Sequence, residues 1–359
     1  MKIMVTGNLG YIGPSVMSQL RQSYPLSYLV GMDLGFFSHC LTGVEAFPES
    51  VIDRQIIKDV RDVEQADFIG FDAVVHLAAV SNDSMGKSFE RITDEINCQS
   101  SIKIARLAKS AGVRNYVFAS SCSVYGEATA FAKKEEHALN PLTAYARSKI
   151  DTEIGLKNLA TEEFVITCLR FATACGFSAR TRLDLVLNDF VAGAIANGLI
   201  EVLSDGTPWR PLIHIADMAR AIDWAVSREV HNGGSMLVIN TGSDEWNYQV
   251  SELADAVATE ISGTKVEINP NAMPDNRSYK VDFSKFQELA PKHQPQISLV
   301  EAVRDLRDGL KDMGFSNRKY RESSLIRLNV LNGHIKSNRL TDNLKWVMGM
   351  YPTRASDLS

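Results

Sequence analysis

The stretch that decides the fold lies at the start of the sequence and reads Lys2-Ile3-Met4-Val5-Thr6-Gly7-Asn8-Leu9-Gly10-Tyr11-Ile12-Gly13. A short apolar run ends there in three glycines at three-residue spacing, and an amphipathic segment over residues 14–23 follows at once. This order predicts a strand, a tight turn and a helix. Gly7 permits the sharp turn and Gly13 permits close packing of the helix on the strand, because neither residue carries a Cβ.

The same turn has the form of a phosphate-binding loop. Gly10 lets the backbone approach a pyrophosphate, and the N-terminus of the following helix offers unpaired amides and the positive end of the helix dipole. We therefore assign residues 7–13 to a dinucleotide cofactor. Any tight turn from a strand to a helix can use glycines at this spacing, so a purely structural turn stays open on these residues alone.

A second apolar run, residues 27–33, ends in Asp33, twenty positions after Gly13. A carboxylate at this place can accept hydrogen bonds from the two hydroxyls of a ribose. The residues that follow are Leu34, Gly35 and Phe36, none of them cationic. A 2′-phosphate would meet an uncompensated negative charge there, so the sequence favours NAD over NADP.

The composition is that of an ordinary soluble globular protein, with 45% hydrophobic and 23% charged residues in a chain of 359. A net charge of −5 argues against a nucleic-acid-binding surface. The sequence has no apolar run of about eighteen residues and no signal-peptide pattern, so we expect no membrane partner and a cytoplasmic location. The five cysteines form no C-x-x-C pair and no cluster with histidine, which favours reduced, mostly buried thiols and no metal site.

Residues 54–62 predict a third strand that ends in a polar loop. In a doubly wound sheet this loop lies beside the adenine of a dinucleotide, so we assign Asp59 and the Val60 backbone to the base. A solvated turn is the alternative.

Residues 72–79 are apolar almost throughout, as in a strand that is buried on both faces. The run ends in Leu77, Ala78 and Ala79, where small side chains leave room for a cofactor at the carboxyl edge of the sheet. His76 within this run is interpreted as a packed, hydrogen-bonded histidine.

Residues 115–121 and 164–171 predict two further strands, and residues 89–111 predict a helix that stops at Gly112. The alternation of strands and helices indicates an α/β fold with a doubly wound parallel (Rossmann) sheet and right-handed crossovers.

The sequence pattern changes after residue 171. Short strands such as residues 236–240, and helices near residues 186–197, 215–227 and 250–260, predict a smaller mixed α/β cap over the strand ends. We divide the chain into an NAD-binding domain (1–171, with some later segments returning to it), a substrate-binding cap (172–319) and a C-terminal extension (320–359).

A tyrosine and a lysine share one face of a further predicted helix. Thr143 marks the start of that helix, and Tyr145 and Lys149 lie four positions apart, so both side chains project from the same side. Such a pair is common on structural helices. Ser121, at the end of an upstream strand, makes a proton-transfer unit with them possible.

Three motifs occur in a fixed order: Gly7-x-x-Gly10-x-x-Gly13, Ser120-Ser121-x-x-Val124-Tyr125-Gly126 and Tyr145-x-x-x-Lys149. With them the chain resembles the extended short-chain dehydrogenase/reductase family, and more narrowly its nucleotide-sugar epimerases and dehydratases, over about residues 1–310. The resemblance implies NAD on the N-terminal sheet, a nucleoside-diphosphate sugar under the cap and a homodimer that packs the helices near residues 89–111 and 145–160.

The resemblance also implies residue roles. Tyr145 matches the general base, Lys149 matches the residue that holds the nicotinamide ribose, and Ser121 matches the hydroxyl that hydrogen-bonds the sugar; Ser120 joins the cofactor site. A tyrosine with an ordinary pKa near 10 needs a shift of about three units, about 4 kcal/mol, to act near neutral pH. Two nearby positive charges in a partly desolvated site can supply it.

Two arginines resemble the residues with which the family grips a diphosphate, namely Arg210 and Arg277, and forked guanidinium donors suit phosphate oxygens. A surface salt bridge is the alternative for each. His214 and Asp217 are interpreted as structural. The residues assigned to the sugar nucleotide are Ser121, Cys122, Ser123, Tyr145, Thr173, Asn188, Arg210 and Arg277.

Departures from the family pattern decide the expected reaction. In the 4,6-dehydratases the residue matching Ser121 is followed by Asp and Glu, whereas this chain has Cys122 and Ser123. Small neutral residues resemble the 4-epimerases, so we expect inversion at C4 through a transient 4-keto sugar. Thr173 lies where relatives often carry other residues, which leaves the sugar open.

Other functions remain open on the sequence. They are a 4,6-dehydratase, a 4-ketoreductase, a 3,5-epimerase that uses Cys122 as acid or base, and a non-catalytic NAD sensor. In the C-terminal extension, Arg321 or Arg327 can reach a phosphate, or the segment packs on the body of the protein; the sequence does not choose between the two.

Overall fold

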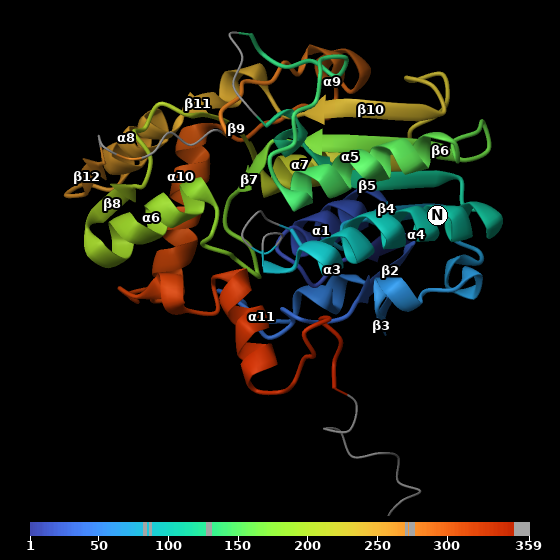
Figure 1. The fold of residues 1–359 in the computed structure, drawn as a ribbon, viewed down its shortest axis with the longest axis horizontal. Coiled ribbons are helices and arrows are strands. Elements are labelled where there is room, and N and C mark those ends of the chain that lie inside the picture. Colours follow the sequence, from blue (N-terminus) through green and yellow to red (C-terminus); the bar gives the residue numbers. More distant parts are fainter. Residues whose placement is uncertain (82–84, 86–87, 127–130, 270–271, 273–276, 348–359) are drawn as a thin grey trace, which may run out of the picture.

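The computed structural model describes residues 1–81, 85, 88–126, 131–269, 272 and 277–347. Its centre is a seven-stranded sheet made of β1 (Lys2–Thr6), β2 (Tyr28–Asp33), β3 (Arg54–Ile57), β4 (Ala73–His76), β5 (Asn115–Ser121), β6 (Val165–Phe171) and β10 (Met236–Thr241). The strand order is β10-β6-β5-β4-β1-β2-β3, and every neighbouring pair is parallel (Figure 1).

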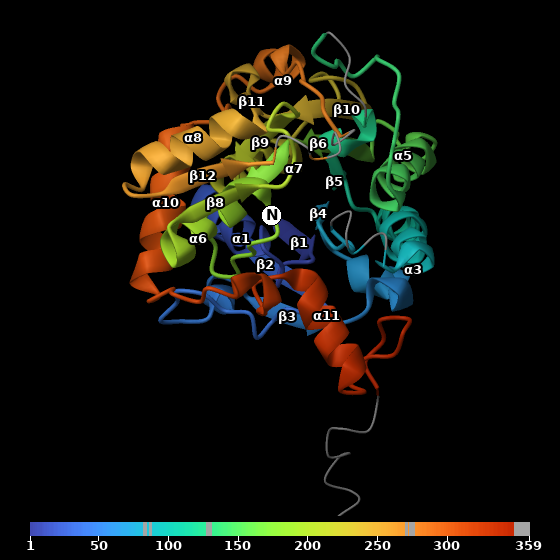
Figure 2. The ribbon, with the colours of Figure 1, turned by 60° about the vertical axis from the view of Figure 1, so that its left-hand side comes forward.

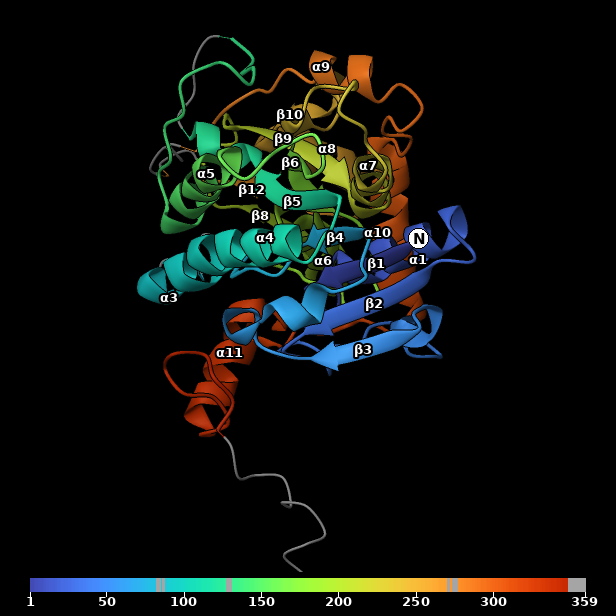
Figure 3. The same cartoon turned by 90° about the vertical axis from the view of Figure 1, so that its right-hand side faces the viewer.

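Helices cover both faces of this sheet. They are α1 (Gly13–Ser23), α3 (Glu90–Asp94), α4 (Ser100–Ser110), α5 (Ala144–Lys157) and α7 (Ile215–Val226), with a π-helical turn, η4 (Glu95–Gln99), joining α3 to α4. Figure 3 shows α3, α4 and α5 on one face and α1 and α7 on the other. The predicted doubly wound parallel fold is confirmed.

A smaller group of elements lies over the carboxyl ends of the strands (Figure 1). Its sheets are β11-β9-β7 and β12-β8, built from β7 (Thr173–Cys175), β8 (Leu199–Val202), β9 (Trp209–His214), β11 (Asn247–Gln249) and β12 (Lys265–Ile268). Its helices are α6 (Val186–Asn197), α8 (Val250–Glu260) and α10 (Leu299–Asp312), which share one apolar core.

The remaining helices are α9 (Ser284–Leu289) and α11 (Arg327–Lys336). Short 3₁₀ helices occur at η1 (Pro48–Val51), η2 (Val60–Asp62), η3 (Gln65–Phe68), η5 (Cys122–Tyr125), η6 (Asp244–Trp246) and η7 (Tyr320–Glu322). Within the described ranges, no helix has both the length and the apolar character that crossing a bilayer requires.

Two segments expected in the cap belong to the main sheet instead. Residues 236–240 lie in β10, which pairs in parallel with β6 from Met236 opposite Ile166 to Thr241 opposite Phe171. The helix expected near residues 215–227 is α7, which packs beside α1 against the sheet. The placement of these two segments in the cap was wrong. A short apolar strand or an amphipathic helix has the same sequence pattern whichever sheet it packs with.

The turn after β1 is shaped by close backbone approaches. Gly7 has φ +78°, and a Cβ on it would lie 2.5 Å from the Ala78 nitrogen at the end of β4. A Cβ on Gly13 would overlap the backbone of Asn8. The glycines therefore let α1 start directly at the sheet edge, between the ends of β1 and β4.

Gly13→Ala should lower the free energy of unfolding by about 1–3 kcal/mol, because the added methyl group forces the Asn8 backbone to move. Gly333→Ala in α11 is the control, since an added Cβ there meets no atom within 4 Å. Denaturant unfolding of both variants measures the effect. Equal stability of the two would show that the turn accommodates a side chain.

Candidate active site

The described residues enclose a cavity of about 990 Å³ between the strand ends and the cap. Its walls include Gly7, Gly10 and Gly13 from the first turn, and Arg210 and Arg277 from the cap side. The glycine loop and the cap arginines, more than 190 residues apart in sequence, thus face one space.

The glycine loop has the shape that a dinucleotide diphosphate requires. Gly7, Gly10, Tyr11, Ile12 and Gly13 line the cavity, and α1 begins there without a side-chain cap on its first amides. Such amides suit an anion. The missing Cβ atoms keep the backbone open to close approach, so these residues fit the cofactor assigned to them.

Three members of the loop point their side chains elsewhere. Asn8 is 1% exposed and hydrogen-bonds Gln55 (Asn8 Nδ2 to Oε1, 2.7 Å), while Leu9 is a buried core residue. The Tyr11 hydroxyl donates to the Gly176 carbonyl at 2.5 Å. Asn8 and Leu9 do not line the cavity, so their assignment to the cofactor is corrected, whereas Tyr11 lines it with its hydroxyl turned to Gly176.

Asp33 lies at the end of β2 and lines the cavity. Its carboxylate accepts from the amides of Leu9 (3.1 Å) and Gly35 (2.7 Å). Burial raises the pKa of Asp33, while the two amides oppose this shift. The carboxylate is thus fixed beside the glycine loop, at the position expected for a ribose diol.

Asp59 and Val60 also line the cavity. The carboxylate of Asp59 caps η2 through the Arg61 amide at 2.9 Å and forms a bidentate ion pair with the Arg61 guanidinium. The solvated turn considered for Asp59 is wrong, because its side chain is buried by this pair. Leu77, Ala78 and Ala79 lie on the wall between this loop and Ser121.

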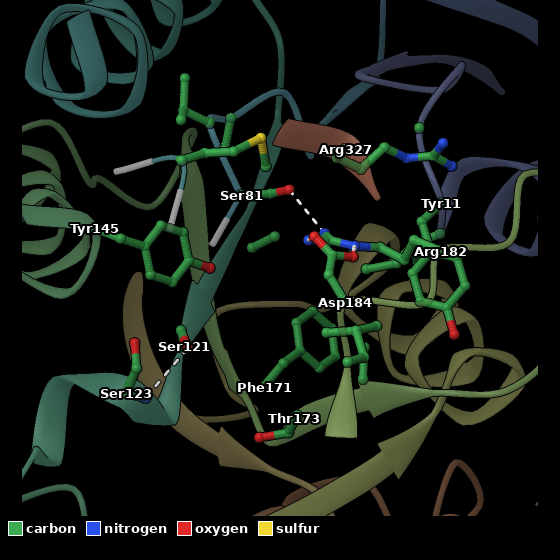
Figure 4. Close-up of a pocket in the computed structure, with 18 of the residues that line it drawn as sticks. Tyr11, Ser81, Ser121, Ser123, Tyr145, Phe171, Thr173, Arg182, Asp184 and Arg327 are labelled. Carbon is green, nitrogen blue, oxygen red and sulfur yellow. Dashed lines mark hydrogen bonds and ion pairs between the residues drawn. The ribbon is translucent and has the colours of Figure 1, made fainter. Parts of the chain in front are cut away.

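Tyr145, Ser121 and Ser123 lie on one side of the cavity, opposite Arg182 and Asp184 (Figure 4). Tyr145 comes from the first turn of α5, which begins where the Thr143 hydroxyl accepts from the Ala146 amide at 3.1 Å. The Ser121 hydroxyl oxygen accepts from the Ser123 amide at 3.2 Å. The fold thus places the three sequence-predicted side chains on one wall.

Lys149 follows Tyr145 by one turn on the same face of α5. Its ammonium donates to the Ala119 carbonyl at 2.6 Å and lies 5.5 Å from the centre of the Tyr145 ring. Burial lowers the pKa of Lys149 to about 8, and the nearby Glu153 opposes the shift. A positive charge therefore lies next to Tyr145 at neutral pH.

A buried ionic network supports this wall, and the sequence analysis missed it. Glu153, one turn beyond Lys149, forms a bidentate ion pair with Arg170 (closest atoms 2.7 Å apart) and accepts from the Ser120 hydroxyl at 2.6 Å. Ser120 lines the cavity but directs its hydroxyl to Glu153. The spacing of Tyr145, Lys149 and Glu153 at four-residue intervals was the available signal.

Cys122 does not line the cavity, and its assignment to the substrate is corrected. Its side chain is 1% exposed and its thiol donates to the Arg170 carbonyl at 3.0 Å. Burial raises the pKa of the Cys122 thiol. Since a buried thiol aimed at a carbonyl can neither reach a sugar nor ionise near neutral pH, the structure gives no support to acid–base chemistry at Cys122.

Asn188 is likewise corrected, because it is fully buried and does not line the cavity. Its amide group accepts from the Gly176 amide (3.2 Å) and donates to the Tyr11 hydroxyl (3.0 Å) and the Arg182 carbonyl (2.9 Å). It holds the segment between β7 and α6 against the glycine loop, which is a structural role.

Thr173, Arg210 and Arg277 line the cavity, as a substrate site requires. The Arg210 guanidinium also donates to the Trp209 carbonyl at 2.9 Å. Both arginines come from the cap side, whereas Thr173 starts β7, two residues after Phe171 at the end of β6, and lies near Phe171 in Figure 4.

Arg182 and Asp184 occupy the wall opposite Tyr145, and sequence reasoning did not single them out (Figure 4). The Arg182 guanidinium forms a bidentate pair with Asp184 (2.6 and 2.8 Å) and donates to the Ser81 hydroxyl at 3.0 Å. They lie in a polar loop without a repeating pattern, so only the fold brings them to the site.

The histidines and the cysteines agree with their structural interpretation. His76 is held between the Thr6 and Ser101 hydroxyls (2.7 and 2.8 Å), and burial lowers its pKa to about 3. His214 caps α7, and Asp217 accepts from the amides of Gln296 and Ile297. All five cysteines are free thiols and buried, as predicted.

Comparison with known proteins places these features in a family. The model of the NAD dependent epimerase/dehydratase family matches residues 3–242. A UDP-glucose 4-epimerase of Corynebacterium glutamicum is 27% identical over 343 residues, covering 89% of this chain and 99% of its own. A UDP-arabinose 4-epimerase of Arabidopsis thaliana is 24% identical, covering 86% of this chain and 77% of its own.

Solved structures share the fold. The UDP-glucuronic acid 4-epimerase from Bacillus cereus, in complex with UDP-glucuronic acid and NAD, has a TM-score of 0.71 at 24% identity and covers 87% of this chain and 100% of its own. Because the family model covers residues 3–242, about two thirds of the sequence, this chain belongs to the NAD dependent epimerase/dehydratase family.

Proposed function

We propose that the protein is a nucleotide-sugar epimerase that inverts C4 through a transient 4-keto sugar. The observation that carries the proposal is the wall of the cavity formed by Tyr145, Lys149 and Ser121, which faces both the glycine loop and the cap arginines. A base, a cation and a hydroxyl donor beside a dinucleotide site suit oxidation and reduction of a secondary alcohol.

In this proposal Tyr145 removes the proton from the C4 hydroxyl. Before that step the Lys149 ammonium stabilises the phenolate form of Tyr145, because an adjacent positive charge lowers the pKa of a phenol. Ser121 donates a hydrogen bond to the sugar oxygen. Bound NAD would supply the acceptor for the C4 hydride and the donor for its return.

Inversion requires the keto sugar to present its opposite face before the hydride returns. Arg210 and Arg277 are proposed to hold the diphosphate while the sugar turns, since guanidinium groups match phosphate oxygens. Ser123 and Thr173 offer neutral side chains to the sugar region. In the reduction step Tyr145 gives its proton back to the C4 oxygen while the hydride would return to C4, so the reaction would consume no cofactor.

A 4,6-dehydratase is the second candidate, because this family joins epimerases and dehydratases in one description. Elimination of water needs an acid and a base beside C5 and C6. Here Cys122 is buried against the Arg170 carbonyl and position 123 is a serine. These two positions therefore favour epimerisation.

The proposal is tested by incubating the purified protein with UDP-, GDP-, CDP- and dTDP-sugars and separating the products by chromatography and mass. A product of unchanged mass and different retention is expected. A product lighter by one water would replace the proposal with the dehydratase. Consumption of reduced cofactor with a 4-keto sugar, without epimerisation, would indicate a ketoreductase.

Tyr145→Phe should reduce turnover by a factor of about 100 or more while NAD stays bound, because general acid–base catalysis typically contributes 10²–10⁴-fold. Tyr28→Phe, on an exposed part of β2, is the matched control and should be as active as the wild type. Unchanged turnover of the Tyr145 variant would remove this residue from the mechanism.

Asp33→Ala should weaken NAD binding by about 1–3 kcal/mol, because a charged hydrogen-bond acceptor for the ribose is lost. Calorimetric titration of the nucleotide-free protein with NAD measures this. Asp312→Ala, exposed at the end of α10, should bind as the wild type does. If the two variants bind equally well, the ribose is held by another group.

The pH dependence should report the Lys149 ammonium. Its pKa is lowered to about 8, so its charge is lost as the pH rises above that value, and kcat/KM should then decline. In Lys149→Arg the guanidinium keeps its charge over this range. The decline of the activity that this variant retains should therefore occur at higher pH than in the wild type. Identical alkaline limbs in wild type and variant would contradict the assignment.

A further inference from the structure

The segment of residues 320–347, here named the C-terminal strap, crosses the end of the sheet where β2 and β3 finish. Figure 2 shows α11 beside these strand ends, and Figure 3 shows it just beyond the arrowheads of β2 and β3. The strap therefore lies on the loops that line the Asp33 end of the cavity.

The loop after β2 is held by aromatic residues of the strap. The Trp346 indole N–H donates to the Leu34 carbonyl at 2.8 Å, and its ring lies 5.7 Å from the ring of Phe36. His334 Nε2 hydrogen-bonds the Phe36 carbonyl at 3.1 Å. Leu34 and Phe36, which flank Gly35 after Asp33, are thus held from outside by the strap.

The loop after β3 is held through one buried guanidinium. Arg61, whose side chain is 5% exposed, donates to the carbonyls of Asn343 (2.7 Å) and Leu344 (2.9 Å). The same guanidinium pairs with Asp59. The strap is therefore connected directly to the loop assigned to the adenine.

A second buried guanidinium anchors the start of α11. Arg327 is 1% exposed, donates to the carbonyls of Arg180 and Thr181, and lies 5.0 Å from the ring of Phe37. Both ends of the strap are thus tied to the body of the protein by buried polar contacts, which are costly to break in the interior.

The inner side of the strap forms part of the cavity wall. Leu331 and Leu344 are 2% and 0% exposed and line the same cavity as Asp33 and Val60. With the diphosphate on the glycine loop and a ribose on Asp33, the adenosine of the dinucleotide comes to lie at this end.

We propose that the C-terminal strap is a component of the cofactor site: it covers the adenosine half of NAD and makes release of the cofactor depend on displacement of the strap. This inference rests on the proposed use of NAD by the cavity. A redox-neutral cycle regenerates its cofactor at every turnover, so a covered cofactor costs no activity. The strap thus acts by retaining NAD and takes no part in the chemical step.

The test compares Trp346→Ala, and a chain that ends at Ser337, with the wild type. The NAD-loaded proteins are diluted into excess labelled NAD, and the exchange rate is measured together with the fraction of NAD that co-purifies. Both variants should exchange NAD about tenfold faster or more, because covering contacts worth about 1.4 kcal/mol or more are lost. Lys336→Ala, exposed at the end of the same helix, should exchange at the wild-type rate.

A wild-type exchange rate in both variants would overturn the proposal. A measurement on the unaltered chain adds a second criterion: NAD should slow tryptic cleavage after Lys336 and Arg339, and equal cleavage with and without NAD would also overturn it. Absence of epimerisation with every sugar nucleotide, together with faster NAD exchange in the variants, would instead contradict the proposed function and support the strap.

Discussion

Close backbone contact at the carboxyl ends of β1 and β4 is the constraint on which the rest of the structure depends. Gly7 approaches Ala78 and Gly13 approaches Asn8 so nearly that a side chain at either glycine would collide with backbone atoms. This contact lets α1 begin at the sheet edge with its first amides facing the cavity. An open phosphate-binding turn exists only because side chains are absent there.

The wall that carries Tyr145 depends on charge instead. Lys149 is buried beside Tyr145, and burial alone would favour its neutral form. Glu153 opposes this, and it is itself held by Arg170 on β6 and Ser120 on β5. Helix α5 is therefore locked to two strands by the same network that keeps the lysine charged. The same residues therefore stabilise this wall of the cavity and set the charge beside the proposed base, Tyr145.

The predicted strands and helices show how much of the fold a local sequence pattern determines. The strand predicted over residues 115–121 is β5, and the helices predicted over residues 186–197 and 250–260 are α6 and α8. Each has a clear apolar period and defined ends. The pattern of residues 236–240 was just as clear, yet it did not reveal that β10 pairs with β6, because pairing depends on a partner strand 70 residues away.

The sequence by itself determined the parallel sheet, the glycine turn, the carboxylate after β2 and the four-residue spacing of Tyr145 and Lys149, because each follows from local geometry or a short motif. Only the tertiary structure decided which side chains face the cavity. It buried Cys122 and Asn188 in the protein interior, away from the cavity. It also brought Arg182 and Asp184 opposite Tyr145 and placed the C-terminal strap over the loops after β2 and β3. These outcomes depend on packing between distant segments, which no local pattern encodes.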